Sequence, residues 1–182
     1  FLRKVGDWNR FSENTGGTLV EKFCNFFDRM VQIMPVRPVR VMASGAQDVN
    51  HLDEVYDGRV PDILDNAFVI VDFDDGARGL LDLCMFAEAT HNQEELSVVG
   101  PLGKVEALIP EDVVRIGRRG EHWIGGVNVH PVTNDEIPYV GHHSGSSWVE
   151  HQKFRDAVLG VAPAEVSLFD GLLSVAIGAA AH

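Results

Sequence analysis

The feature that most constrains this fold is a pair of alternating segments joined by a tight turn. From position 66 to 73, apolar side chains occupy every second position, at Ala67, Val69, Val71 and Phe73. This period of two is typical of a β-strand. The following Asp74-Asp75-Gly76 favours a hairpin turn, because glycine readily adopts the positive φ that such turns need. Residues 77–87 alternate again, so the sequence predicts an antiparallel hairpin.

The returning segment is apolar on both of its faces. Leu81, Leu83 and Met85 share one face, while Leu80 and Cys84 lie on the other. A sheet with two apolar faces must be covered on both. Helices predicted elsewhere in the chain would cover one face, and a second subunit could cover the other.

Further elements lie on both sides of this hairpin. Alternation and turn residues predict strands at 36–44, 94–99, 104–109, 113–118 and 122–129. Helical spacing predicts helices at 18–34, 148–159 and 167–181, after an irregular or edge segment at 1–15 that Trp8 and Phe11 would anchor. The sequence therefore predicts an α+β fold: one domain over residues 1–182, with an open, largely antiparallel β-sheet and helices packed on one face.

The first predicted helix opens at Gly16-Gly17, with Thr18 as its N-cap, and ends before Pro35. Its apolar positions recur at helical spacing. Its polar positions form one stripe, made of Glu21, Asn25, Asp28 and Gln32. A polar stripe is ordinarily a solvated face, so spacing alone assigns it no function.

The same residues carry a family resemblance. A Gly pair is followed by Glu21, by Asn25 four residues later, and by Asp28 three residues after that. This pattern resembles the start of the second domain in the Gfo/Idh/MocA family of NAD(P)-dependent sugar and cyclitol oxidoreductases. The resemblance continues through residues 48–51, 65–68, 100–106 and 141–151 and covers essentially the whole chain.

The resemblance implies a substrate-binding and oligomerising domain of a dehydrogenase. It places Glu21, Asn25 and Asp28 in a cleft that binds a sugar or cyclitol, and it implies assembly of copies through the sheet face. NAD or NADP is implied for the full-length enzyme only, because this chain has neither a Gly-x-Gly-x-x-Gly turn nor the family's Glu-Lys-Pro motif. Family enzymes usually carry a His where this chain has Asn25, and an amide cannot carry a proton near neutral pH. The catalytic residue is therefore unassigned.

Histidines form the other notable group. His142, His143 and His151 cluster in a stretch rich in Gly and Ser. Three interpretations stay open: a metal site, a pocket rim that donates hydrogen bonds to substrate hydroxyls, and plain surface or capping histidines. Adjacent histidines do not by themselves point at one ligand site. We therefore expect no metal and place His142 and His143 among the candidate substrate-binding residues.

Charge and cysteine content restrict the partners and the compartment. The formal net charge is −12, which disfavours nucleic acid and anionic membranes as partners. Cys24 and Cys84 lie in apolar runs, so free thiols and a reducing, cytoplasmic location are expected. The charged start of the chain has no signal-peptide pattern, and the apolar tail is too short to span a bilayer.

The resemblance thus implies the C-terminal half of a sugar or cyclitol dehydrogenase, expected to be inactive as an isolated piece and to be preceded in the full protein by a nucleotide-binding domain. The alternative is a non-catalytic, stand-alone module that assembles through its sheet, which Asn25 would suit. The long polar connection at 45–62 could be a functional loop or a solvated excursion.

Overall fold

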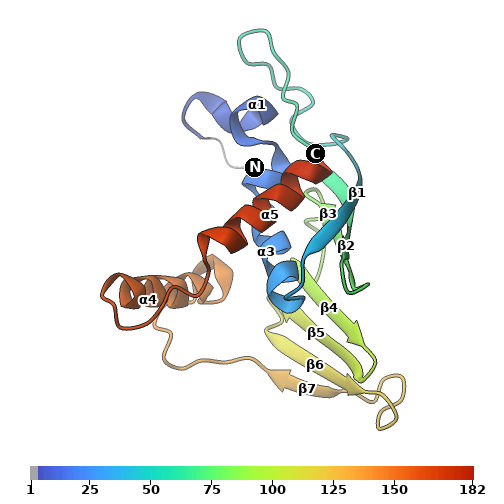
Figure 1. Ribbon diagram of the computed structural model, residues 1–182. Coiled ribbons are helices and arrows are strands. Elements are labelled where there is room, and N and C mark those ends of the chain that lie inside the picture. The colour runs from blue at the N-terminus through green and yellow to red at the C-terminus, as the bar shows by residue number, and fades with distance from the viewer. Residues whose placement is uncertain (1–3) are drawn as a thin grey trace. The chain divides into compact units, whose positions relative to one another are not determined.

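The computed structural model describes residues 4–182, except for the side chain of His142. Residues 1–3 of the expected irregular segment lie outside the described residues. The chain divides into two compact units, one that runs to Ala87 and includes Val166–His182, and one formed by Glu88–Glu165. Figure 1 shows the elements of both units.

The first unit is built on a three-stranded antiparallel sheet of β1 (Pro38–Ala46), β2 (Asn66–Phe73) and β3 (Arg78–Cys84), in that order. The expected hairpin is confirmed, with Val69 opposite Leu81. The four alternating residues of β2 are all buried, as are Leu81 and Leu83, because successive side chains of a strand point to opposite faces.

Helices α2 (Thr18–Glu21), α3 (Cys24–Ile33) and α5 (Leu168–Ala181) pack against this buried face. The short helices η1 (Val5–Arg10) and α1 (Ser12–Thr15) precede α2 in the chain. Leu19 of α2, Phe27 of α3 and Ile177 of α5 join the buried residues of β2 and β3 in one hydrophobic core. Figure 1 shows α5 beside α3 over this sheet. The N-terminal segment thus contains two short helices, where the sequence predicted none, and η1 is kinked at Gly6 and Asp7. Phe11 is buried as expected, while Trp8 is 39% exposed.

The predicted single helix at 18–34 is wrong in one respect, because it is broken at Lys22 and Phe23. Phe23 leaves the helical conformation, with φ −112° and ψ 5°, and its ring packs 5.4 Å from that of Phe26. Thr18 is not the N-cap either. Gly17 takes that position, and the Thr18 hydroxyl donates instead to the carbonyl of Leu64 at 2.6 Å. Apolar periodicity continues across the break and therefore hides it.

The connection between β1 and β2 is held at its start by the buried carboxylate of Asp65. The backbone N–H groups of Asp48, Val49 and Asn50 donate to it at 3.0, 2.8 and 2.7 Å, and Asn66 Nδ2 donates at 3.0 Å. Burial alone would raise the pKa of Asp65, but these four hydrogen bonds outweigh it and lower the pKa.

A second carboxylate, Glu54, ties the same connection to the N-terminal segment. Arg10 Nε lies 2.7 Å from its Oε2, Tyr56 donates to Oε2 at 2.8 Å, and His51 Nδ1 lies 3.0 Å from Oε1. Burial alone would raise the pKa of Glu54, but the hydrogen bonds from Arg10, His51 and Tyr56 lower it to about 2. Asp65 and Glu54 therefore tie the connection to the rest of the first unit, although most of its residues are exposed.

The second unit contains a four-stranded antiparallel meander of β4 (Glu94–Gly100), β5 (Gly103–Ile109), β6 (Val113–Arg118) and β7 (Asn128–Pro131). It also contains η2 (Gly141–His143) and α4 (Ser146–Val158). The strand expected at 122–129 is wrong for most of its length. Turns occupy residues 119–121 and 124–125, where Gly120 and Gly125 adopt positive φ, and β7 starts only at Asn128.

The predicted class is confirmed: the fold is α+β and its strands are antiparallel throughout the described residues. The strands form two hydrogen-bonded sheets, where the sequence suggested one. Within the part of the chain that the structure describes, no helix is both long and apolar enough to cross a membrane.

Candidate functional site

Glu21 is the last residue of α2, and the helix break separates it from the rest of the expected polar stripe. Its carboxylate pairs with the Lys4 ammonium, and its side chain is the less exposed of the two. Lys4 also lies over the Trp8 ring, 4.7 Å from its centroid. The carboxylate is therefore held by a cation at the edge of the N-terminal helical segment.

Asn25 and Asp28 lie on α3, one helical turn apart. Asn25 is exposed, and Asp28 is partly buried. The Oδ1 atom of Asp28 is buried and has no hydrogen-bond partner among the described residues. A buried acceptor without a donor is costly, which makes Asp28 the most unusual of the predicted site residues. The structure thus keeps Asn25 and Asp28 together on one helix, with Glu21 on the preceding one.

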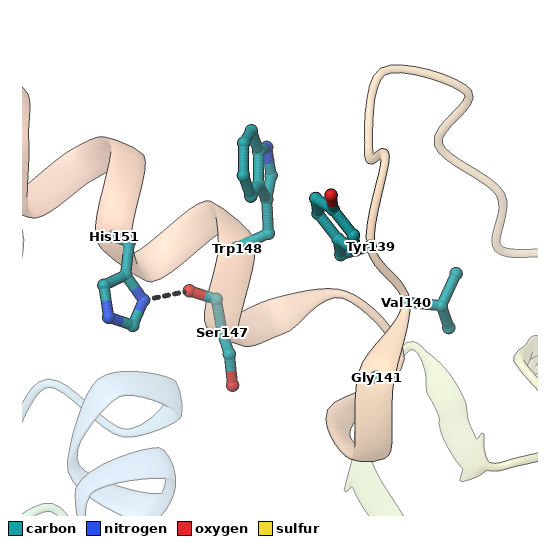
Figure 2. Close-up of a pocket in the computed structure, with 6 residues that line it drawn as sticks. All are labelled: Tyr139, Val140, Gly141, Ser147, Trp148 and His151. Carbon is teal, nitrogen blue, oxygen red and sulfur yellow. Dashed lines mark hydrogen bonds between the residues drawn. The ribbon is translucent and has the colours of Figure 1, made fainter.

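An aromatic cavity of about 380 Å³ lies in the second unit. Figure 2 shows its lining by Tyr139, Val140, Gly141, Ser147, Trp148 and His151. The Tyr139 and Trp148 rings lie 5.9 Å apart between centroids and are tilted by 48°. They come from opposite sides of the turn that η2 and Gly145 form, because Gly145 adopts φ +84° ahead of α4. The cavity offers flat apolar walls with hydroxyl and imidazole groups at its edge.

His151 has a defined tautomer in this cavity. Its Nδ1 lies 2.6 Å from the backbone carbonyl oxygen of Ser147, one turn earlier in α4 (Figure 2). A carbonyl can only accept, so Nδ1 carries the proton, and Nε2 of the neutral ring is left as an acceptor. His151 can therefore accept a hydrogen bond from a ligand hydroxyl.

The two predicted histidines lie in η2, next to this cavity in sequence. The side chain of His143 is exposed, and that of His142 lies outside the described residues. Sequence reasoning did not single out Tyr139 or Trp148 as cavity residues. The available signal was two aromatic residues on either side of a loop rich in Gly, His and Ser.

A metal ion and a dinucleotide each need a particular arrangement of residues. Residues 4–182, without the side chain of His142, contain no group of three or more His, Cys, Asp or Glu residues suited to a metal ion. All strand pairs in the same range are antiparallel, so they form no parallel βαβ unit of the kind that holds a dinucleotide at a Gly-rich turn.

Comparison with known proteins identifies the family of this chain. All 182 residues match the Gfo/Idh/MocA C-terminal family model, described as the oxidoreductase family, C-terminal alpha/beta domain. The chain belongs to this family. A search of curated proteins found no match.

Solved structures of the same fold include several dehydrogenases. Levoglucosan dehydrogenase, in complex with NADH and levoglucosan, matches with a TM-score of 0.76 and 16% identity, over 96% of this chain and 50% of its own. UDP-N-acetylglucosamine 3-dehydrogenase from Acidithiobacillus ferrooxidans matches with a TM-score of 0.66 and 15% identity, over 92% and 48%. An oxidoreductase from Agrobacterium radiobacter, in complex with NAD+, L-tartaric acid and magnesium, matches with a TM-score of 0.67 and 12% identity, over 93% and 49%.

These identities show a shared fold and no more. The chain spans about half the length of the solved structures that it matches. The activity of a whole enzyme is therefore a matter of proposal for this chain.

Proposed function

We propose that this chain is the substrate-binding and oligomerisation domain of an NAD(P)-dependent oxidoreductase that acts on a hydroxyl-bearing carbon of a sugar or cyclitol. The observation that carries the proposal is the unpartnered, buried oxygen of Asp28, one turn from exposed Asn25 on α3. Family membership and dehydrogenase relatives support it. The cofactor, NAD or NADP, belongs to a neighbouring domain of the full enzyme.

Each residue has a role that its chemistry allows. Asp28 accepts a hydrogen bond from a ring hydroxyl and so satisfies its buried oxygen. Asn25 both donates and accepts, which suits a second hydroxyl. Glu21 orients a third, and the ion pair with Lys4 holds this carboxylate in place. Asn25 cannot take a proton, so the base that receives the hydroxyl proton lies in the part of the enzyme that holds the cofactor.

The aromatic cavity of the second unit suits the same class of ligand. A sugar ring has C–H faces and a hydroxyl edge. Tyr139 and Trp148 offer flat walls, and His151, which lines the same cavity, offers Nε2 as an acceptor. We assign His142 and His143 to the rim around such a ligand.

We further propose that copies of the chain assemble through the exposed face of the first sheet. Phe68 and Leu80 are 58% and 62% exposed on this face, a large solvent-facing apolar area for β2 and β3. Charged neighbours of both signs surround them, with Arg40 paired to Asp72 at one end of the strands. A face that carries both signs around an apolar centre is self-complementary, so a second copy fits it in an isologous contact.

The test is titration of the full enzyme with sugars and cyclitols, myo-inositol and glucose first, followed by calorimetry. We expect Asp28→Asn to weaken binding of the sugar or cyclitol by about tenfold, because a neutral amide replaces the charged acceptor of the hydrogen bond to the ligand hydroxyl. Glu150→Gln, an exposed change on α4, is the matched control and should leave binding unchanged. We expect the isolated 182-residue chain to bind these ligands weakly and to reduce no nicotinamide. Equal affinity of wild type and Asp28→Asn would count against the proposal.

A second candidate is a non-catalytic module that assembles through the same sheet. Asn25 at the position of the family's usual His favours it, because proton transfer is lost there. The two candidates differ in turnover by the full protein, and Asn25→His separates them further. A module without catalysis gains nothing from the restored imidazole.

A further inference from the structure

A second cavity, of about 300 Å³, lies within the second unit at the turn end of its sheet. The β4–β5 turn, the end of β6 and the loop before β7 all contribute to its lining. Its charged and aromatic lining residues are Lys104, Arg118, Arg119, His122 and Trp123. Neither the family assignment nor the proposed sugar site gives this cavity a role.

The hollow depends on glycine. Gly103 adopts φ +154°, and a Cβ there would lie 2.0 Å from the carbonyl oxygen of Gly117 on β6. A side chain at Gly117 would in turn meet Val127 at 3.3 Å. The turn can therefore approach β6 closely because Gly103 lacks a side chain, and Val127 packs closely on β6 because Gly117 lacks one.

The charge of the cavity is opposite to that of the chain. The whole chain carries −12, yet the described lining has basic side chains and no Asp or Glu. Lys104 forms a 2.6 Å ion pair with Glu106, a residue that does not line the cavity. Arg118 and Arg119 form no ion pair with any residue in the described part of the chain. Two arginines that line the same cavity and lack an ion-pair partner among the described residues are suited to bind an anion.

His122 adds a further donor. Its Nδ1 accepts the backbone N–H of Arg118 at 3.0 Å, so in the neutral ring the proton resides on Nε2. This imidazole can therefore donate to an anion beside the two arginines.

Trp123 supplies a flat surface in the same place. Its ring is 89% exposed, although burial is the ordinary state of so large an apolar side chain. The turn that presents it is closed by a hydrogen bond from Gly126 N–H to the Trp123 carbonyl at 2.8 Å. This loop thus exposes an indole ring in the same cavity as the cationic side chains. The indole can stack on the planar ring of a ligand, and the cations can bind a phosphate that the ligand carries.

We propose that this cavity binds a phosphorylated ring compound of nucleotide size, with the ring stacked on Trp123 and the phosphate bound by Arg118, Arg119 and His122. Its volume lies at the lower end of the range for small-molecule sites. One local group of cations on an acidic chain is too small a surface for a nucleic acid strand, which needs a continuous basic track. The proposal is independent of the sugar-binding function, because all of its residues belong to this cavity.

The probe is uridine 5′-diphosphate, added to the full 182-residue chain, with calorimetry for affinity. Tryptophan fluorescence of wild type and Trp123→Phe then locates the ligand, because only the wild type reports on this indole. We expect saturable binding with a Kd below about 1 mM. Pyrophosphate should bind more weakly than uridine 5′-diphosphate, because it lacks the ring that stacks on Trp123. Uridine should bind most weakly, because it lacks the phosphate groups.

The decisive variant is Arg118→Gln with Arg119→Gln, which should weaken binding at least tenfold. Lys153→Gln with Arg155→Gln removes two exposed cations from α4 of the same unit and should leave the affinity unchanged. Circular dichroism checks that each variant is folded, and the single change Arg119→Gln provides a milder test. The proposal is overturned if no saturation occurs, if the double arginine variant keeps wild-type affinity, or if both cation pairs matter equally.

Discussion

Replacing Asp65 by Asn should strongly destabilise the first unit. The two carboxylate oxygens of Asp65 accept four hydrogen bonds, and three of the donors are backbone N–H groups at the start of the β1–β2 connection. An Asn side chain keeps the shape but turns one oxygen into an NH₂ group, which cannot accept. Whichever oxygen is lost, two donors lose their acceptor.

The magnitude follows from that count. An unsatisfied buried donor costs about 1–3 kcal/mol, so the substitution should lower the free energy of unfolding by about 2–5 kcal/mol at neutral pH. The pH dependence has a definite sign. Because the folded-state pKa of Asp65 is lowered from 3.8, its contribution is complete above that pH and is lost as the pH falls through the folded-state pKa.

The assay is urea unfolding followed by far-ultraviolet circular dichroism, over a series of pH values from neutral to acid. Asp53→Asn is the matched control, because this carboxylate is exposed in the same β1–β2 connection. Asp65→Asn should flatten the acid-side fall in stability that wild type and Asp53→Asn both show. The reasoning would be refuted if Asp65→Asn differed from wild type by less than about 0.5 kcal/mol, or if its stability fell in acid as steeply as that of the wild type.

Three further changes test other parts of the structure. Gly178→Ala should destabilise the protein by about 1–3 kcal/mol in thermal melting, because the new Cβ would lie 2.5 Å from the carbonyl oxygen of Leu19. In the control Gly171→Ala, on the same helix, the new Cβ meets nothing within 4 Å, so this change should be neutral or stabilising. Equal effects of the two changes would contradict this packing. Glu54→Gln should lower stability at neutral pH and remove the part of the acid-side loss between pH 4.5 and about 2, measured by urea unfolding; an unchanged pH profile would show that its hydrogen bonds contribute nothing. Phe68→Asp should shift the protein to a smaller species in light scattering after size exclusion, and an unchanged mass would exclude this face as the contact.

Local pattern predicted the first sheet well. The alternation in β2 places Val69 and Val71 in the core and leaves Phe68 outside, because side-chain direction in a strand is fixed by position. The same logic placed most of the other strands. The prediction failed before β7, where Gly125 and Gly126 lie in a turn. Alternation that allows glycine at either kind of position does not distinguish such a turn from a strand.

Contacts between distant residues were beyond this reasoning. Nothing local to Asp65 indicates that it binds the N–H groups of residues 48–50, since these lie about fifteen positions away. The break at Phe23 was hidden because apolar spacing continues through it. The family resemblance supplied Glu21, Asn25 and Asp28 as candidates. Only the structure shows that one oxygen of Asp28 is buried without a hydrogen-bond partner among the described residues.

The most direct test of the account is hydride transfer by the complete enzyme. The nicotinamide absorbance of NAD and of NADP is followed with a panel of sugars and cyclitols, for wild type, Asp28→Asn and Asn25→His. The account predicts saturable reduction with at least one of these substrates, and a fall in kcat/KM of about tenfold in Asp28→Asn. Absence of reduction with every member of the panel, in wild type and in Asn25→His alike, would contradict it.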